Sequence, residues 1–186
     1  GNAGQAAGET GAASAGRGLA DGAVGRTVFE LRRPRTIPGV WAADGLVHAW
    51  DEDGMRVAAS AVDESGKIDL NAVADALLKG LLQTAGQLDA DTAGRLVDVI
   101  GDWKDADDLR RPNGAEAAEY QAAGLAYKPA NAAFETVADL QRVLGMTPAL
   151  FARLAGSLTV YSGAPGINPQ FASRTVLMAL PGATDA

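Results

Sequence analysis

Acidic side chains gather in one stretch of the sequence, residues 98–120, where seven carboxylates accompany only three basic residues. The acids are Asp98, Asp102, Asp105, Asp107, Asp108, Glu116 and Glu119. Carboxylates this close together repel one another unless positive charge lies among them. Ca²⁺ meets that need, because it binds about six to eight oxygen ligands, which a turn supplies from Asp side chains and backbone carbonyls. The stretch is therefore a candidate calcium site.

Five carboxylates are the candidate calcium ligands: Asp102, Asp105, Asp107, Asp108 and Glu116. With Asp105 as the first position of an EF-hand loop, Asp107 takes the third. Asn113 then takes the ninth and Glu116 the twelfth. The fifth and sixth positions hold a leucine and an arginine where an EF-hand has an acidic residue and a glycine, so any calcium loop here is irregular. The alternative is a solvated acidic turn anchored by Trp103, since runs of charge usually only contact water.

Composition argues against other site chemistries. The chain has no cysteine, which excludes thiolate nucleophiles and cysteine zinc sites, and a multi-histidine centre would have to rest on His48 alone. His48 lies in an alternation of apolar residues, 46–50, that is typical of a half-exposed strand. Paired carboxylates serve a glycosidase only at a defined separation in a cleft, which a sequence cannot supply. A structural subunit is favoured over an enzyme.

Nucleic acid is not an expected partner. The net charge is -7 and the isoelectric point is about 4.6, whereas affinity for phosphate comes from clustered Lys and Arg. The alternative function is a helix-hairpin-helix nucleic-acid-binding module, whose pattern residues 140–148 and 176–182 resemble. The second segment has only four residues after Gly182, too few for another helix. No apolar run approaches the ~20 residues of a membrane span.

The first third of the chain predicts one helix and one hairpin. Residues 1–18 are rich in Gly and Ala and are expected to be a flexible leader or the remnant of a truncated N-terminal helix. Apolar residues then recur with helical period over 19–31, and Pro34 ends the helix. Two strand-like runs, 46–50 and 55–62, are separated by a hairpin signal at Asp53 and Gly54. Asn71 is a candidate N-cap for the next helix.

From residue 72 onward the apolar period is helical. Helices are predicted over 73–86, 89–103, 116–123, 137–144 and 148–154, strand character returns at 158–162, and a last helix begins at Pro169. Strands on both sides of a helical block predict an α+β fold in which the block is an insertion. The expected domains are an α+β domain of 19–71 with 156–186, and a helical insertion of 72–155.

Five motifs, in this order, resemble the general secretion pathway protein K family. They are Asp-Glu-Ser-Gly-Lys-Ile-Asp-Leu-Asn at 63–71, Asp-Trp-Lys-Asp-Ala-Asp at 102–107, Gly-Ala-Glu at 114–116 with Tyr120, Leu-Thr-Val-Tyr-Ser at 158–162, and Ile167 and Asn168 ahead of Val176 and Leu177. The resemblance covers about residues 19–182. Asp69 departs from the Asn expected there, which puts only a local cap or turn hydrogen bond in doubt.

The resemblance implies a minor pseudopilin of the bacterial type II secretion system. Its expected fold is a pilin-like N-terminal helix on a small antiparallel sheet, with a large all-α, SAM-like insertion. Its expected partners are the minor pseudopilins I and J at the pseudopilus tip, and also the major pseudopilin G. The resemblance further implies protein export across the outer membrane, a single-pass inner-membrane helix outside these residues, a periplasmic location for this domain, and calcium in the helical part.

The N-terminal helix is the expected contact with I and J. Its candidate partner-binding residues are Leu19, Gly22, Ala23, Gly25 and Arg26. Small side chains along this helix would let another helix approach closely. The same small residues would equally fit the helix against its own sheet, and one helix can do both on different faces.

Overall fold

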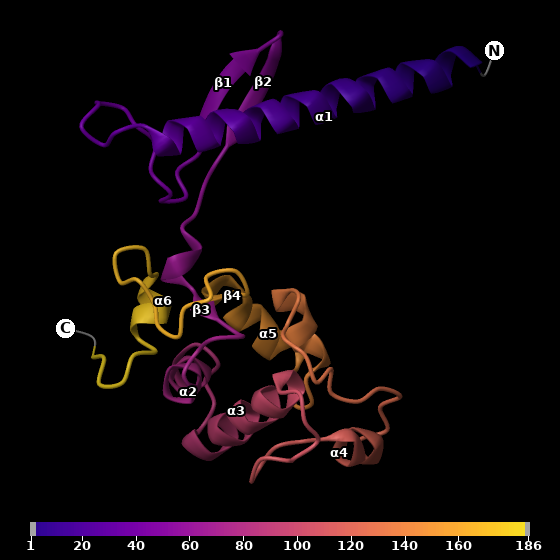
Figure 1. The fold of residues 1–186 in the computed structure, drawn as a ribbon, viewed down its shortest axis with the longest axis vertical. Coiled ribbons are helices and arrows are strands. Elements are labelled where there is room, and N and C mark those ends of the chain that lie inside the picture. The colour runs from indigo at the N-terminus through magenta and orange to yellow at the C-terminus, as the bar shows by residue number, and fades with distance from the viewer. Residues whose placement is uncertain (1–2, 185–186) are drawn as a thin grey trace. The chain divides into compact units, whose positions relative to one another are not determined.

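The computed structural model describes residues 3–184, with side chains described over 16–184, and divides the chain into two compact units, Gly1–Asp63 and Glu64–Ala186 (Figure 1). Unit 1 holds α1 (Ala3–Arg32), β1 (His48–Glu52) and β2 (Met55–Ala59). Unit 2 holds the remaining elements: η1 (Glu64–Gly66), β3 (Ile68–Asp69), α2 (Asp75–Thr84), α3 (Ala90–Lys104), α4 (Ala117–Ala122), η2 (Val137–Arg142), α5 (Pro148–Leu154), η3 (Ala155–Ser157), β4 (Leu158–Thr159) and α6 (Arg174–Leu177).

Helix α1 begins well before the predicted start. It runs without interruption from Ala3 to Arg32, so residues 3–18 are helical, and of the two predictions for this segment the helix agrees with the structure whereas the flexible leader does not. Alanine is the strongest helix former and is frequent there, which offsets the cost of the interspersed glycines. The predicted end of the helix, just before Pro34, is confirmed. Residues 1–2 lie outside the described part of the chain.

The hairpin of unit 1 is confirmed. Strands β1 and β2 are antiparallel, with His48 opposite Ala59, and the turn residues Asp53 and Gly54 have φ of 50° and 77°. Two positive φ angles in succession are the signature of the type I′ turn. His48 is half-buried, as predicted, and its ring stacks on Trp41 with centroids 4.0 Å apart. No side chain described within residues 16–63 is fully buried, so unit 1 has no closed core.

The core of unit 2 centres on aromatic side chains. Trp103 and Tyr120 are 1% and 0% exposed, and their ring centroids lie 6.0 Å apart. Phe134 stacks on Trp103 at 6.2 Å, and the hydroxyl of Tyr120 accepts a hydrogen bond from the N–H of Leu144 at 2.9 Å. Helix α2 packs against α3 through buried leucines (Figure 1). Tyr120 therefore lies inside the core, with its hydroxyl satisfied by the backbone.

Two of the helix starts agree with the predictions from the sequence, and two do not. Asp89 caps α3 by accepting hydrogen bonds from the N–H groups of the first turn, and Pro148 opens α5. Asn71 caps nothing. Its side chain donates to Phe134 O at 3.0 Å and accepts from Phe134 N at 2.8 Å, so it ties two distant loops together, and α2 begins later. Pro169 opens only a single turn, because the helical bonds restart at α6, which Ser173 caps.

Two further elements differ from prediction in length or type. The segment 137–144 forms the 3₁₀-helix η2 instead of an α-helix. Strand character at 158–162 yields only β4, which pairs with β3 in parallel, Ile68 opposite Leu158. The expected small antiparallel sheet is therefore limited to β1 and β2, because the described residues form two separate two-stranded sheets and the second is parallel. Parallel pairing needs a long crossover between the strands, and the helical block supplies it.

The domain boundaries also differ from the prediction, because the pairing of β3 with β4 joins residues on both sides of the helical block. Residues 64–71 and 156–186 were expected to join the N-terminal domain, but they belong to unit 2 with the helices. Close backbone contacts hold them there. Gly66 lies against the carbonyl of Phe171 and Gly80 against that of Ala179, and at both positions a Cβ would overlap the neighbouring backbone. Over the described residues, no helix combines the length and the apolar character of a membrane span.

Candidate functional site

The five predicted calcium ligands lie at the end of α3 and in the loop that leads to α4. Asp102, in the last turn of α3, is fully buried, and Glu116 is 8% exposed. Asp105 is half-buried, whereas Asp107 and Asp108 are exposed. Glu116 directly precedes α4, as predicted, and its backbone N–H donates to Oε2 of Glu119, three residues later. The loop thus brings two buried carboxylates and one half-buried carboxylate into the same region.

Asp102 is held by the loop backbone. The N–H of Arg111 donates to both carboxylate oxygens at 3.2 Å, and Nε of Arg111 lies 3.8 Å from Oδ1. Gly114 packs directly onto the carboxylate, and a Cβ at that position would overlap it. Burial, and to a lesser degree the charge of Asp105, raises the pKa of Asp102, while the hydrogen bond from Arg111 opposes that rise.

Glu116 is the most perturbed carboxyl of the loop. Its pKa is raised to about 7, by burial first and then by the charges of neighbouring acids, in the order Asp102, Asp105, Asp108 and Asp107. Its Oε1 is buried and has no hydrogen-bond partner within the described part of the chain. The pKa of Asp105 is also raised, by burial and then by the charge of Asp107. These carboxylates are close enough to disfavour one another's ionisation.

Asn131 contacts this acidic loop, although it lies in a later segment that the sequence analysis did not connect with the loop. Its Nδ2 donates to the backbone O of Asp107 at 3.0 Å and to Oδ1 of Asp108 at 2.9 Å. The only sequence signal is the residue type, since Asn tolerates the positive φ of 47° found here. Asn113, the predicted ninth position, is instead bound to Asp98 through its N–H and its Nδ2, at 3.1 and 3.0 Å.

Three buried oxygens in this region lack a hydrogen-bond partner among the residues described: Asp105 Oδ1, Glu116 Oε1 and Asn131 Oδ1. Unpaired buried polar atoms are costly, and each needs an explanation. No three acidic or histidine side chains in the described residues are placed to hold one ion. The donor set nevertheless has calcium chemistry, since calcium also accepts amide and carbonyl oxygens and tolerates irregular geometry.

Most of the partner-binding candidates of α1 lie toward the hairpin of their own unit. Leu19 and Ala23 line a groove of about 570 Å³ together with β2. The guanidinium of Arg26 lies over the ring of Trp50, 4.5 Å from its centroid. A Cβ at Gly22 would lie 4.0 Å from the carboxylate of Glu52, whereas one at Gly25 would meet no described atom within 4 Å. Gly25 is therefore the most open of the five.

The helix-hairpin-helix candidate at 140–148 spans η2, a turn at Gly145 with φ of 88°, and the start of α5. The one at 176–182 has no second helix in the part that the structure describes.

Comparison with known proteins decides the family. Residues 56–163, more than half of the chain, match the family described as type II secretion system (T2SS), protein K. This chain belongs to the protein K family. The resemblance inferred from the five sequence motifs is thereby confirmed.

The fold is also similar to a solved structure. A chain in the crystal structure of the GspK-GspI-GspJ complex, from the type 2 secretion system of enterotoxigenic Escherichia coli, matches with a TM-score of 0.66 and 18% sequence identity. The match covers 90% of this chain and 64% of that chain. At this identity the similarity concerns the fold. A search of curated proteins found no match.

Proposed function

We propose that this protein K chain is part of a minor pseudopilin that assembles with the minor pseudopilins I and J at the tip of the pseudopilus. There it would support protein export across the outer membrane. The family match over residues 56–163 carries the proposal, and the fold similarity to a chain of the GspK-GspI-GspJ complex supports it. The role is structural rather than enzymatic. The chain would lie in the periplasm as part of a protein that is anchored in the inner membrane. The major pseudopilin G would be a further partner.

Each unit has its own part in this proposal. Helix α1 with the β1–β2 hairpin corresponds to the pilin-like part, because a long helix accompanied by antiparallel strands is the element that pilin-like subunits share. The helices of unit 2 correspond to the SAM-like insertion. Contact with I and J falls on the open side of α1, where no described atom lies within 4 Å of a Cβ built at Gly18 or Gly25. Small residues on that side permit close helix packing.

Co-purification with I and J tests the assembly. Gly18→Leu and Gly25→Leu add bulk on the open side of α1, and we expect both to abolish co-purification while far-ultraviolet dichroism and the unfolding midpoint stay unchanged. Gly156→Leu is the matched control, since it adds the same side chain at an open glycine of unit 2. Survival of the complex in both α1 variants would place the contact elsewhere and refute the role given to this helix.

We also propose that the acidic loop binds Ca²⁺ through Asp105, Asp107 and Glu116, with Asp102 and Asp108 as further ligands. The support is the set of unpaired buried oxygens and the mutual repulsion that raises the pKa of Glu116 to about 7. Bound calcium would supply the missing positive charge and tie the end of α3 to the start of α4. Binding to the folded state alone stabilises it by about 2.7 kcal/mol at a ligand concentration 100 times Kd.

Thermal unfolding in EDTA and in millimolar CaCl₂, combined with calorimetric titration, tests the calcium site. We expect a higher midpoint in calcium for the unmodified chain, and no increase for the double variant Asp105→Asn/Glu116→Gln. Asp91→Asn, an exposed acid in the first turn of α3, is the control and should keep the calcium effect. Equal midpoints in EDTA and CaCl₂, with no calorimetric signal, would overturn the calcium proposal and leave the assembly proposal standing.

A further inference from the structure

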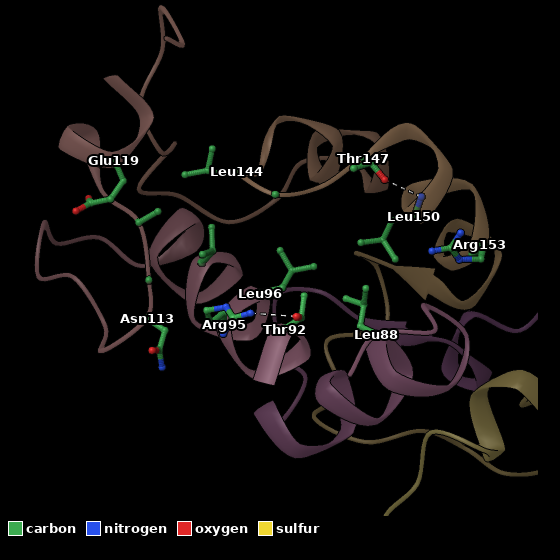
Figure 2. A pocket seen from close by; sticks show the side chains of 14 residues that line it. Leu88, Thr92, Arg95, Leu96, Asn113, Glu119, Leu144, Thr147, Leu150 and Arg153 are labelled. Atoms are coloured by element: carbon green, nitrogen blue, oxygen red, sulfur yellow. Dashed lines mark hydrogen bonds between the residues drawn. The ribbon is translucent and has the colours of Figure 1, made fainter. Parts of the chain in front are cut away.

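Unit 2 carries a pocket that neither the acidic loop nor α1 uses. It has a volume of about 390 Å³ and lies between α3, the loop ahead of α4 and the segment 144–153 (Figure 2). Its floor is apolar and buried, made of Leu96, Val99, Ala115 and Leu150, with exposed fractions between 2% and 8%. Pockets of this size and lining are those that hold ligands in proteins.

Two arginines stand at this pocket without an acidic partner. Arg95 comes from α3 and Arg153 from α5, and both are exposed (Figure 2). Nη2 of Arg95 donates to the hydroxyl of Thr92 at 3.0 Å, and Nη2 of Arg153 donates to Gly86 O at 2.9 Å. Neither guanidinium lies within 4.0 Å of a carboxylate in the described residues. Each keeps further N–H donors for a ligand.

The one acid that lines the pocket does not neutralise them. Oε1 of Glu119 is paired with Nη1 of Arg110 at 3.1 Å, and its Oε2 accepts the N–H of Glu116 at 2.9 Å. The hydrogen bond from the Glu116 backbone, and then the charge of Arg110, lower the pKa of Glu119. The chain as a whole has 23 acidic and 16 basic residues. Because acidic residues outnumber basic ones, a surplus of basic residues does not explain why two arginines beside this apolar floor lack an acidic partner among the described residues.

We propose that this pocket binds a peptide segment of another protein, in which an aliphatic or aromatic side chain stands next to a carboxylate. This inference rests on the proposed function, in which the chain works by contacting other proteins. The apolar side chain covers the floor at Leu96 and Leu150, and the carboxylate meets one of the two arginines, whose fork-shaped donors match it in a bidentate pair. Thr147 lines the pocket, and its hydroxyl oxygen accepts the N–H of Leu150 at 3.1 Å, which leaves its O–H to donate to a peptide carbonyl that an acyl chain lacks.

Fluorescence anisotropy with a labelled acetyl-Gly-Glu-Leu-Phe-Glu-Gly amide probe tests the pocket on the complete chain. We expect saturable binding that weakens at least tenfold in the double variant Arg95→Glu/Arg153→Glu. Lys128→Glu reverses an exposed positive charge of unit 2 outside the pocket and should leave Kd unchanged. Probe versions with Gln for both Glu residues, or with Ser for Leu and Phe, should each bind at least tenfold more weakly. Amide shifts of Leu96 and Leu150 in ¹⁵N spectra locate the site.

Three outcomes would overturn the proposal: no saturation at millimolar probe, binding that the arginine double variant does not weaken, or shifts confined to residues outside the pocket. Saturable binding of decanoate with no competition from the peptide would assign the pocket to an acyl carboxylate instead. Because the titration contains neither I nor J, its failure does not affect the co-purification result. Failure of co-purification with intact probe binding would refute the assembly and not the pocket.

Discussion

Glu116 makes the stability of unit 2 depend on pH in the opposite sense to most carboxylates. Its pKa is raised from the ordinary 4.5 to about 7, by burial first and then by neighbouring acids. Because the folded-state pKa exceeds the unfolded one, the protonated form is favoured by folding. The stabilisation is fully present below pH 4.5 and is lost as the pH rises through about 7. Glu116→Gln removes this titration and leaves a neutral side chain of nearly the same shape.

The size of the effect follows from the pKa difference. One pKa unit corresponds to about 1.36 kcal/mol, so a change from 4.5 to about 7 gives an upper limit of roughly 3 kcal/mol. Glu116 is 8% exposed, so solvent screens its charge little. We expect Glu116→Gln to stabilise the calcium-free chain by about 2 kcal/mol at pH 8 and by almost nothing at pH 4.5. Asp102 and Asp105 also have raised pKa values, and because their charges act on Glu116 the measured difference includes the loss of that mutual repulsion.

Urea unfolding in EDTA, at steps from pH 4.5 to 8, measures this difference directly. Glu135→Gln removes an exposed carboxylate of the same type and is the control. Parallel stability curves for the unmodified chain and Glu116→Gln would refute the reasoning, because the carboxyl would then have the same pKa folded and unfolded. Millimolar calcium should reverse the order at pH 8, since only the unmodified chain has the full ligand set.

Three further substitutions test the packing of unit 2 by urea unfolding at pH 7. Gly66→Ala should lower the free energy of unfolding by about 1–3 kcal/mol, because its Cβ would overlap a neighbouring carbonyl. Gly156→Ala adds a Cβ in open space and should not lower it. Equal effects of the two substitutions would contradict the close contact at Gly66. Tyr120→Phe should cost about 1 kcal/mol, since it leaves the N–H of Leu144 without an acceptor, and an unchanged midpoint would mean that water replaces the hydroxyl. Asp69→Asn should destabilise by about 1–2 kcal/mol, because its two oxygens accept two separate backbone N–H groups, and a gain would show that the Asn expected from the family is the better residue.

The sequence predicted correctly those elements whose conformation depends on residues close together in the chain. The turn at Asp53 and Gly54 follows from residues that accept positive φ, and α3 follows from a cap at Asp89 and an apolar face that ends in Trp103. The acidic loop was predicted for the same reason, as was a helix start at Glu116, which is the residue directly before α4. In each case the residues that decide the structure lie within one or two turns of one another.

The features that were missed depend on partners far away in the sequence. Asn71 resembles a helix cap, but its bonds go to Phe134, 63 residues later. The parallel pairing of β3 with β4 rests on two residues of each strand, too short a run for any periodic signal. Asn131 reaches the acidic loop from the other side of α4, so no spacing within the loop indicates it. Asn113, the ninth position of the EF-hand register, is bound through its N–H and its Nδ2 to Asp98, which lies 15 residues earlier.

Because unit 1 has no closed core among its described residues, we expect its backbone amides to exchange hydrogen faster than those of unit 2. The fully buried side chains among the described residues all lie in unit 2, and a two-stranded hairpin is at best marginally stable without further packing. Amides of β1 and β2 therefore exchange through local opening, whereas amides in the middle of α3 wait for global unfolding. A subunit that covers α1 and the hairpin would slow exchange there by a factor of one plus the ratio of its free concentration to its Kd. The rate of amide exchange in β1 and β2 would therefore measure whether another subunit is bound.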